Sequence, residues 1–375
     1  MFSPLDHRMM QRALELAALG RYTTQPNPRV GCVIAHGERV VGEGWHRKSG
    51  EAHAEALALR AAGDQARGAT AYVTLEPHSH VSRTPPCTDA LIRAGIRRVV
   101  CGTLDPNPKV LGNGVRQLEA AGVEVTTGLL EDAARELNAG FEKRMRVGLP
   151  RVIVKVAASI DGRVALANGA SQWITSEAAR ADVQHLRAAA SAVLTGIGTV
   201  VADDPQLTVR DPSIELLGRM PLRIVLDSRL RTPPSSRILR APGATLIVAT
   251  DDDAARRDAL TQAGADVCLL PQGRAGGVDL SALLQKLGER ECNDVLVEAG
   301  PILGGRFLEL GLADELVVYV APKLLGPDGK PMFGLPRLDR LDDAVQFKVQ
   351  SMESIGPDVK LVVRPQPRTS GVFER

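Results

Sequence analysis

Apolar residues follow two different spacings along the chain, and the alternation between them predicts an α/β protein. Helical spacing marks residues 5–19, and Gly20 ends that helix. Strand-like runs follow at 30–35 and 39–44, joined by a turn at His36 and Gly37. The rest of the first half alternates in the same way. We expect helices at 54–62, 87–92 and 113–121, and strands at 69–75, 97–101 and 123–126.

A basic, helical stretch at 138–147, broken by Gly148 and Pro150, predicts a change of domain, and a length of 375 residues favours two domains. We therefore expect one domain over residues 1–147 and a second over 148–375. The second half predicts strands at 152–157, 191–195, 222–226, 244–249, 266–270, 293–297, 314–320 and 359–364. Helices are expected at 176–189, 254–263, 279–288 and 303–310, and residues 366–375 are expected to be a frayed tail.

Composition excludes several classes of partner. A formal net charge of +2 and an aromatic content of 3% argue against a nucleic-acid surface. The sequence contains no run of about 18 apolar residues, so we expect no membrane span, and the N-terminus lacks the apolar core of a signal peptide. The five cysteines are odd in number and scattered, which is typical of a reducing compartment, so we expect a cytoplasmic protein.

Residues 51–87 carry the outline of a zinc-dependent deaminase. His53 and Glu55 form an H-x-E motif, His78 follows a Glu-Pro pair, and Cys87 ends a Thr-Pro-Pro-Cys run. Such a site needs three protein ligands, an open fourth position and a carboxylate that moves protons without binding the metal. An isolated H-x-E motif is weak, because a surface histidine and a buried structural cysteine would give the same letters. The combination nevertheless predicts His53, His78 and Cys87 as ligands and Glu55 as the catalytic carboxylate.

The predicted elements place His53 and Cys87 at the starts of two helices. The partial positive charge of a helix N-terminus would favour the thiolate form of Cys87. His78 stands where such motifs usually have cysteine. Three interpretations stay open: His78 binds zinc, His80 replaces it, or the site is weakened or lost.

Three features of the second half predict a ligand site. Lys155 lies in a strand that runs into a turn at Asp161 and Gly162, and a Ser-x-Trp-Ile-Thr segment follows at 171–175. Gly196-Ile-Gly-Thr199 precedes an Asp-Asp-Pro segment. Residues 297–306 run from a strand through a glycine-rich turn into a helix, which suits anion binding, although such a turn taken alone is more often a matter of simple packing. The turn does not match G-x-G-x-x-G, so a Rossmann fingerprint is not supported.

Together these motifs resemble one known family. Pro-Asn-Pro-Arg-Val-Gly-Cys-Val-Ile at 26–34, His-Ala-Glu at 53–55, Thr-Leu-Glu-Pro at 74–77, Arg-Thr-Pro-Pro-Cys at 83–87 and Asp-Pro-Asn-Pro-Lys-Val at 105–110 are similar to the bifunctional deaminase/reductase family of riboflavin biosynthesis, RibD. In that family the positions of His78 and Ser82 are normally Cys and Gly. The resemblance implies an N-terminal cytidine-deaminase-like α/β/α sandwich and a C-terminal dihydrofolate-reductase-like α/β domain.

The resemblance also implies roles for individual residues. Glu55 would shuttle protons, and Lys155 would contact the ribose as its ring opens. In the first domain the pyrimidine and ribose-phosphate pocket would be lined by Asn27, His46, His80, Arg83, Asp105 and Asn107. NADPH would be held by Ala157, Trp173, Thr199, Asp203, Ser228 and the turn Gly300, Pro301, Ile302, Leu303, Gly304, Gly305 and Arg306. The reductase substrate would contact Ser171, Arg187, Leu207, Arg210 and Glu298.

Several of these residues have simpler explanations. Asn27 and Asn107 are typical turn residues between prolines. Arg187 and Arg210 could be solvated charges, and Trp173 could belong to the core.

The implied reaction is zinc-dependent deamination of 2,5-diamino-6-(5-phospho-ribosylamino)pyrimidin-4-one, followed by NADPH-dependent reduction of the ribosyl group to ribityl. The partner would be this small phosphoribosylaminopyrimidine, with no nucleic acid and no membrane, and the assembly a homodimer or homotetramer. The alternative is a monofunctional reductase whose first domain is a degenerate, structural module, because His78 replaces the usual cysteine.

Overall fold

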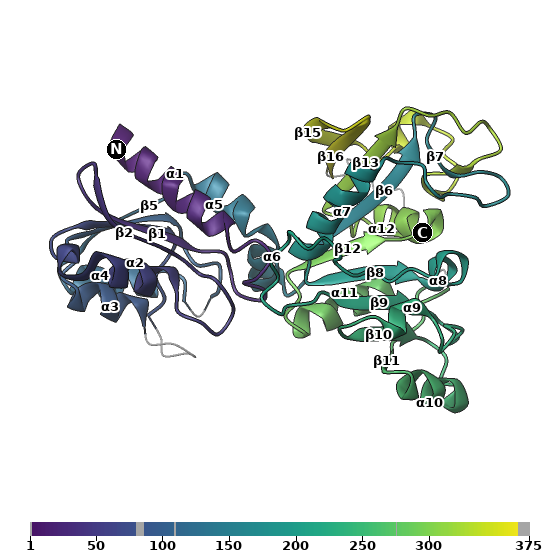
Figure 1. Cartoon of the computed structure of the whole chain (residues 1–375), viewed down its shortest axis with the longest axis horizontal. Coiled ribbons are helices and arrows are strands. Elements are labelled where there is room, and N and C mark those ends of the chain that lie inside the picture. Colours follow the sequence, from purple (N-terminus) through teal and green to yellow (C-terminus); the bar gives the residue numbers. More distant parts are fainter. Residues whose placement is uncertain (1, 80–85, 109, 275, 367–375) are drawn as a thin grey trace. The chain divides into compact units, whose positions relative to one another are not determined.

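The structure is a computed structural model that describes residues 2–79, 86–108, 110–274 and 276–366. Its contacts divide the chain into two compact units (Figure 1). The first unit contains Met1–Leu149 together with the short segment Glu215–Arg219, and the second contains Pro150–Ile214 and Met220–Arg375. The predicted tail lies almost wholly outside the described residues, since only Gln366 of it is described.

The first unit is a five-stranded mixed sheet covered by helices. Its strands are β1 (Gly31–His36), β2 (Arg39–Trp45), β3 (Thr70–Leu75), β4 (Arg98–Thr103) and β5 (Glu124–Thr127), in the spatial order β2-β1-β3-β4-β5. β1 pairs antiparallel with β2 and β3, whereas β3, β4 and β5 are parallel. Its helices are α1 (Pro4–Ala18), α2 (Ala54–Ala62), α3 (Cys87–Arg93), α4 (Asn113–Ala120), α5 (Glu131–Leu137), α6 (Ala139–Val147) and the 3-10 turn η1 (Gly63–Ala66).

Strand alternation gives this sheet two buried faces. Cys32 and Ile34 of β1 pack with Ala54 and Ala58 of α2, and Leu91 of α3 and Leu118 of α4 join the same cluster. Val33 and Ala35, one residue out of phase, pack on the opposite face with α1 and α5 (Figure 1). Because successive side chains point to opposite faces, a strand buried on both sides carries a continuous apolar run, as β1 does from Gly31 to Ala35 before the exposed His36.

The second unit is a nine-stranded sheet in the order β11-β10-β9-β8-β12-β6-β13-β16-β15. Seven neighbouring strands are parallel, from β11 to β13, and β16 and β15 add an antiparallel edge. The strands are β6 (Arg151–Ser159), β8 (Ala192–Gly196), β9 (Leu222–Leu226), β10 (Thr245–Ala249), β11 (Ala265–Leu269), β12 (Asp294–Glu298), β13 (Glu315–Ala321), β15 (Phe347–Ile355) and β16 (Asp358–Pro365), with the small pair β7 (Arg163–Ala165) and β14 (Lys330–Pro331). The helices are α7 (Glu177–Ala189), α8 (Ile197–Asp203), α9 (Arg237–Arg240), α10 (Ala254–Gln262), α11 (Leu280–Glu289), α12 (Pro301–Glu309) and the 3-10 turn η2 (Leu341–Asp343).

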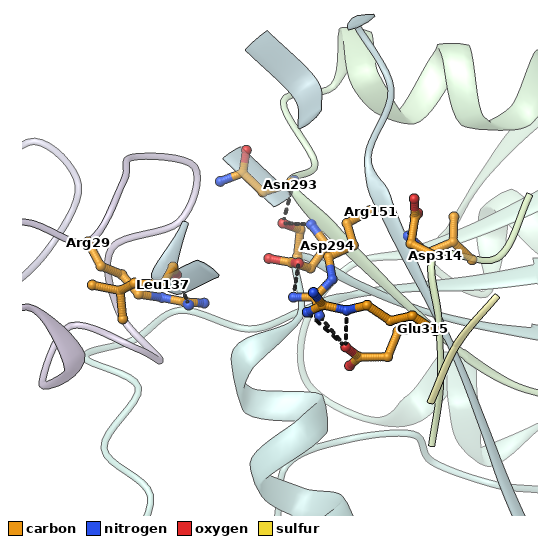
Figure 2. A network of polar contacts seen from close by, with 10 residues as sticks. Arg29, Leu137, Arg151, Asn293, Asp294, Asp314 and Glu315 are labelled. Atoms are coloured by element: carbon orange, nitrogen blue, oxygen red, sulfur yellow. Dashed lines mark hydrogen bonds and ion pairs between the residues drawn. The ribbon is translucent and has the colours of Figure 1, made fainter. Parts of the chain in front are cut away.

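Charged residues close the amino ends of the central strands. Arg151 begins β6, and its Nη2 lies 2.6 Å from Glu315 Oε2 at the start of β13 (Figure 2). Asp314 Oδ2 accepts a hydrogen bond from the Val152 amide at 2.7 Å. These contacts fasten the amino edge of the sheet and leave the carboxyl ends of the parallel strands, where open α/β sheets bind ligands, on the opposite edge.

The structure confirms the predicted α/β architecture and adds elements that the sequence did not reveal. β15 is the clearest case, because seven of its nine residues are exposed and its apolar positions do not alternate. α5 and α8 have seven residues each and bury one residue each, which is too little for a helical period to appear. Within the described part of the chain, no helix combines the length and apolarity needed to cross a membrane.

Candidate active sites

The three predicted zinc ligands lie together in the first unit. One ligand atom from each of His53, His78 and Cys87 falls within 4.8 Å of the other two. His53 is the N-cap of α2, and Cys87 is the first residue of α3, as predicted. The Cys87 amide donates to the His78 carbonyl at 3.0 Å, so two of the three ligands are also joined through the backbone.

These residues fit a zinc ion. In a tetrahedral site with Zn–N near 2.0 Å and Zn–S near 2.3 Å, neighbouring ligand atoms are about 3.3–3.8 Å apart. Cys87 Sγ lies 3.5 Å from His53 Nδ1, within that range. Burial, and then the neighbouring His78 and His46, lower the pKa of His53 to about 4, so its ring is neutral at pH 7 and its nitrogens can bind a metal.

Without a metal, Cys87 does not have the thiolate character expected from its helix position. Burial first, and then the Glu55 carboxylate, raise the pKa of its thiol. The helix effect is weak here because α3 is only seven residues long, whereas the side chain is buried. A thiolate at this position therefore depends on the metal rather than on the helix.

Glu55 is the second residue of α2, in the first turn after His53, and its side chain contacts Cys87. Its side chain is buried, and Oε2 has no hydrogen-bond partner among the described residues. Burial raises the pKa of its carboxyl, against the opposing effects of its own backbone amide and the Cys87 thiol. A buried carboxylate oxygen without a partner is costly, and it is explained if a substrate or water normally meets it.

His46 and Asn27 extend the cluster on one side. The rings of His46 and His53 meet edge to face at 5.2 Å. His46 Nδ1 faces the Ala52 carbonyl at 3.2 Å, which places the proton on Nδ1 and leaves Nε2 to accept from Asn27 Nδ2 at 3.1 Å. Burial lowers the pKa of His46, so it remains neutral at pH 7.

The loop that carries Asn27 is fixed by the start of α6. The Asn138 side chain accepts from the Arg29 amide at 2.8 Å and donates to the Arg29 carbonyl at 2.9 Å. The Arg29 guanidinium reaches the Leu137 carbonyl at 2.6 Å (Figure 2). Asn27 is therefore more than a turn residue, because its loop is held in place and its amide points at His46.

Asp105 and Asn107 lie on the loop that follows β4. The Asn107 amide donates to Asp105 Oδ1 at 2.8 Å. Burial raises the pKa of Asp105 to about 6; the Asn107 hydrogen bond opposes this and the nearby Glu76 carboxylate adds to it. His80, Ser82 and Arg83 lie outside the described residues.

A second polar cluster lies at the centre of the large sheet. Lys155 of β6 is in register with Glu298, the last residue of β12, and Lys155 Nζ lies 3.7 Å from Glu298 Oε2. Arg187 of α7 binds the same carboxylate through Nε at 2.6 Å and Nη2 at 3.0 Å. Burial would raise the pKa of Glu298, but the charges of Arg187 and Lys155 outweigh it and lower the pKa to about 2.

The same cluster disfavours the charge on Lys155. Burial lowers the pKa of its ammonium, Glu298 raises it, and Arg187 lowers it further, with a net decrease. An ammonium held in place with a lowered pKa is suited to proton transfer.

The two arginines expected at the substrate differ. Arg187 uses all three nitrogens on protein acceptors, since its Nη1 donates to the Thr208 carbonyl at 3.1 Å. Arg210 is exposed, and its pKa is lowered by burial and then by the positive charges of Arg187 and Arg237. Of the two, Arg210 is therefore the better placed to meet a phosphate.

The residues expected to hold NADPH follow neighbouring strands at one edge of the sheet. Thr199 and Asp203 lie on α8, directly after β8; Ser228 follows β9; Gly300 follows β12; and Ala157 lies in β6. Trp173 is 63% exposed, with the Arg180 guanidinium 4.6 Å from its ring centre, so the alternative that it is a core residue is wrong. Ser171 precedes it, and Leu207 is buried with φ +52° beside Thr208.

The glycines of the 300–306 turn have two explanations. A Cβ on Gly305 would lie 2.8 Å from the Gly334 carbonyl oxygen, so packing requires glycine there, whereas a Cβ on Gly304 would make only ordinary contact with Phe333 at 3.5 Å. Gly300, the N-cap of α12, has open space around it. Only this first part of the turn is available to an anion.

Sequence reasoning missed residues that support the predicted ones. Tyr319 of β13 is fully buried, with its ring centre 6.0 Å from Lys155 Nζ and its hydroxyl on Asp182 at 2.5 Å. Glu76, two residues before His78, is also buried. No local pattern identifies Tyr319, and the Thr-Leu-Glu-Pro motif gives Glu76 no role, because each role depends on which segments become neighbours in the fold.

The fold and the two sites define an enzyme that combines a zinc-type deaminase domain with a reductase domain. Comparisons with known proteins agree. The family described as the cytidine and deoxycytidylate deaminase zinc-binding region matches residues 3–103, and the family described as the RibD C-terminal domain matches residues 150–361.

Relatives cover nearly the whole chain. Riboflavin biosynthesis protein RibD of Escherichia coli K12 is 50% identical over 365 residues, covering 95% of this chain and 98% of the relative. The solved structure of Acinetobacter baumannii RibD is 44% identical with a TM-score of 0.90, covering 97% of this chain and 99% of that one. A Thermotoga maritima diaminohydroxyphosphoribosylaminopyrimidine deaminase/5-amino-6-(5-phosphoribosylamino)uracil reductase is 34% identical with a TM-score of 0.85, covering 96% and 99%.

The chain belongs to the RibD family of riboflavin biosynthesis. It is a bifunctional deaminase and reductase, with zinc as the cofactor of the first domain and NADPH as that of the second. The predicted fold class is confirmed, and the alternative of a monofunctional reductase is not favoured.

Proposed function

We propose that residues 1–147 deaminate 2,5-diamino-6-(5-phospho-ribosylamino)pyrimidin-4-one and that residues 148–375 reduce the ribosyl group of the product to ribityl. The observation that carries the first half is the meeting of His53, His78 and Cys87 beside the buried carboxylate of Glu55. The observation that carries the second is the Lys155–Glu298–Arg187 cluster at the centre of the large sheet.

In the first site His53, His78 and Cys87 would hold zinc. When bound, zinc acts as a Lewis acid that makes water nucleophilic at neutral pH. Glu55 moves protons: it receives one from the attacking water and delivers it to the departing amine, so water and the amine become a carbonyl and ammonia. Its partner-free Oε2 supports this role.

Asn27, His46, Asp105 and Asn107 would bind the pyrimidine and its ribose phosphate. Asn27 supports this role because its amide contacts His46, and His46 because its ring packs on that of the zinc ligand His53. Asp105 supports it because it is a buried carboxyl group in the same unit. His80 and Arg83 remain proposed on the resemblance of their motif alone.

In the second site NADPH supplies the hydride that reaches the anomeric carbon of the opened ribose. Lys155 donates a hydrogen bond to the ribose oxygen as the ring opens, and Glu298 and Arg187 hold Lys155 in place. Arg210 would bind the phosphate, with Ser171 and Leu207 beside the substrate. NADPH would lie along Ala157, Trp173, Thr199, Asp203, Ser228 and 300–306, at the carboxyl ends of the strands.

We further propose that the chain acts in the cytoplasm as a homodimer or homotetramer, with a small-molecule substrate and neither nucleic acid nor membrane as a partner. The near-neutral net charge and the scattered cysteines support this. Light scattering of the purified chain measures the assembly.

The experiment for the first activity uses Glu55→Gln in the full chain. We expect zinc per chain to be unchanged, ammonia release to fall at least about 100-fold, and NADPH oxidation on the deaminated substrate to be unaffected. Glu38→Gln, an exposed change in the same unit, is the control. A wild-type chain that holds zinc but releases no ammonia would overturn the proposal.

A further inference from the structure

Glu76 is a buried carboxylate that accepts four backbone hydrogen bonds. It follows the last residue of β3 and is 3% exposed. Its Oε2 accepts from the amides of Asp105 at 3.1 Å and Gly112 at 2.9 Å. Its Oε1 accepts from Gly114 at 2.8 Å and Val115 at 3.3 Å. One side chain thus binds the backbone at both ends of the segment from Asp105 to Val115, called the bound segment below.

The segment approaches Glu76 closely. A Cβ on Gly114 would overlap the Pro77 carbonyl oxygen and lie 3.2 Å from Glu76 Oε1. Gly112 has φ +72°, which turns the chain into α4. Glycine is therefore needed at both places for the segment to lie against residues 76 and 77.

Glu76 links two parts of the proposed deaminase site. His78 is two residues further along the chain, and its carbonyl accepts from the Cys87 amide at 3.0 Å. Asp105 and Asn107 lie on the bound segment, and the Asp105 amide is itself one of the four donors. The carboxylate therefore joins the backbone that carries a zinc ligand to the loop that carries substrate residues.

A purely structural interpretation would make Glu76 the N-terminal cap of α4, whose N-cap residue, Gly112, has no side chain. Two observations go beyond that role. Asp105 lies outside α4, so its bond to Glu76 does nothing for the helix. α4 is also fastened independently, because Gln117 accepts from Thr88 Oγ1 at 2.8 Å and donates to Asp89 at 2.7 Å, both on α3.

We propose that Glu76 is a positioning residue of the deaminase, which holds the loop carrying Asp105 and Asn107 in place against the zinc-ligand segment. This rests on the proposed function, since it takes the loop to be part of the substrate pocket. The negative charge is essential, because only a carboxylate offers acceptors to all four amides. A glutamine offers one oxygen and turns an NH2 group toward two of the donors.

Glu76→Gln in the full chain tests the proposal. We expect zinc per chain to stay unchanged and kcat/KM for ammonia release to fall about 10- to 100-fold, mainly through KM, as for other residues that orient a site indirectly. NADPH oxidation on the deaminated substrate should be unaffected. Glu119→Gln, an exposed change on the same helix, is the matched control and should resemble wild type.

Gly114→Ala is the second variant, because it displaces the same segment without changing a charge, and we expect the same rise in KM. If Glu76→Gln does not fold, Gly114→Ala decides by the same criteria. Wild-type kinetics in either folded variant would overturn the positioning role of Glu76. The deaminase function is tested separately, because it depends only on whether the wild-type chain releases ammonia. Loss of zinc or of the folded first domain in both variants would also overturn the positioning role, since Glu76 would then maintain the fold and not the loop.

Discussion

Arg187 donates hydrogen bonds to both oxygens of the Glu298 carboxylate, from Nε at 2.6 Å and from Nη2 at 3.0 Å, although 111 residues separate the two in the chain. The two side chains are only 11% and 9% exposed, and Lys155 Nζ lies 3.7 Å from the same carboxylate. Arg187 therefore holds the Glu298 carboxylate in place, and that carboxylate in turn positions the Lys155 ammonium. The catalytic lysine of the proposed reductase is positioned by a carboxylate that cannot easily move.

Glu298→Gln should destabilise the chain in a pH-dependent way. Burial raises the pKa of Glu298, the Arg187 and Lys155 charges lower it more, and the result is about 2 against 4.5 in the unfolded chain. A lowered folded-state pKa gives stability that is present above about 4.5 and is lost as the pH falls toward 2. Removing the carboxylate leaves buried positive charges unpaired, at a cost of about 3–5 kcal/mol at pH 7.

Urea unfolding at pH 7, 4 and 3 measures this difference between variant and wild type. The difference should narrow below pH 4.5. Glu289→Gln, in an exposed pair with Lys286, is the control and should show almost no effect. A difference that stays constant down to pH 3 would contradict the account.

Lys155→Met should abolish reduction and spare deamination. The ammonium is lost while a side chain of similar length remains, and Arg187 still pairs with Glu298. NADPH oxidation on the deaminated substrate should fall at least about 100-fold. The midpoint of thermal unfolding should not fall, because burial already disfavours the lysine charge. Lys286→Met is the control, and reduction that survives in Lys155→Met would remove this residue from the mechanism.

Arg210→Gln should weaken binding of the phosphorylated substrate. The pKa of Arg210 is lowered first by burial and then by the positive charges of Arg187 and Arg237, so a phosphate bound there would relieve the repulsion between these arginines. KM for reduction should rise about 10- to 100-fold, the value of one or two hydrogen bonds to a charged group. The exposed Arg229→Gln is the control. An equal loss on the dephosphorylated substrate would show that Arg210 does not contact the phosphate.

His78→Ala and His78→Cys together test the unusual ligand. The alanine variant should lose zinc and ammonia release, because only His53 and Cys87 remain. The cysteine variant should keep both, since a thiolate is an equally good ligand. Metal analysis of the purified chains measures the result. Full zinc in His78→Ala would show that another residue, with His80 the first candidate, completes the site.

The sequence predicted the main elements because their burial is periodic. β1 carries an apolar run because both of its faces are covered up to Ala35. His53 is the N-cap of α2 and Cys87 the first residue of α3, and the motif itself locates both. The short helices α5 and α8 and the exposed strand β15 lack such a signal. The periodic spacing of apolar residues reflects burial, so it does not predict elements that bury few residues.

The candidate sites were predictable where residues are close in the chain, or where the resemblance assigned them. The sequence did not reveal that the guanidinium nitrogens of Arg187 donate hydrogen bonds to Glu298 and Thr208. Nor did it reveal that Glu76 accepts a hydrogen bond from the loop that carries Asp105. Those contacts depend on which strands become neighbours. The sequence also did not reveal that, in the metal-free chain, burial raises the pKa of the Cys87 thiol, because burial is a property of the packed chain.

The central claim is that one chain carries two separate sites, of which only the first needs zinc. The most direct test removes zinc from the purified full chain with a chelator and then restores it. Ammonia release, measured with the diaminopyrimidine substrate, should disappear and return with the metal. NADPH oxidation on the deaminated substrate should stay constant throughout. Ammonia release that survives complete removal of zinc, or reduction that falls with it, would contradict the account.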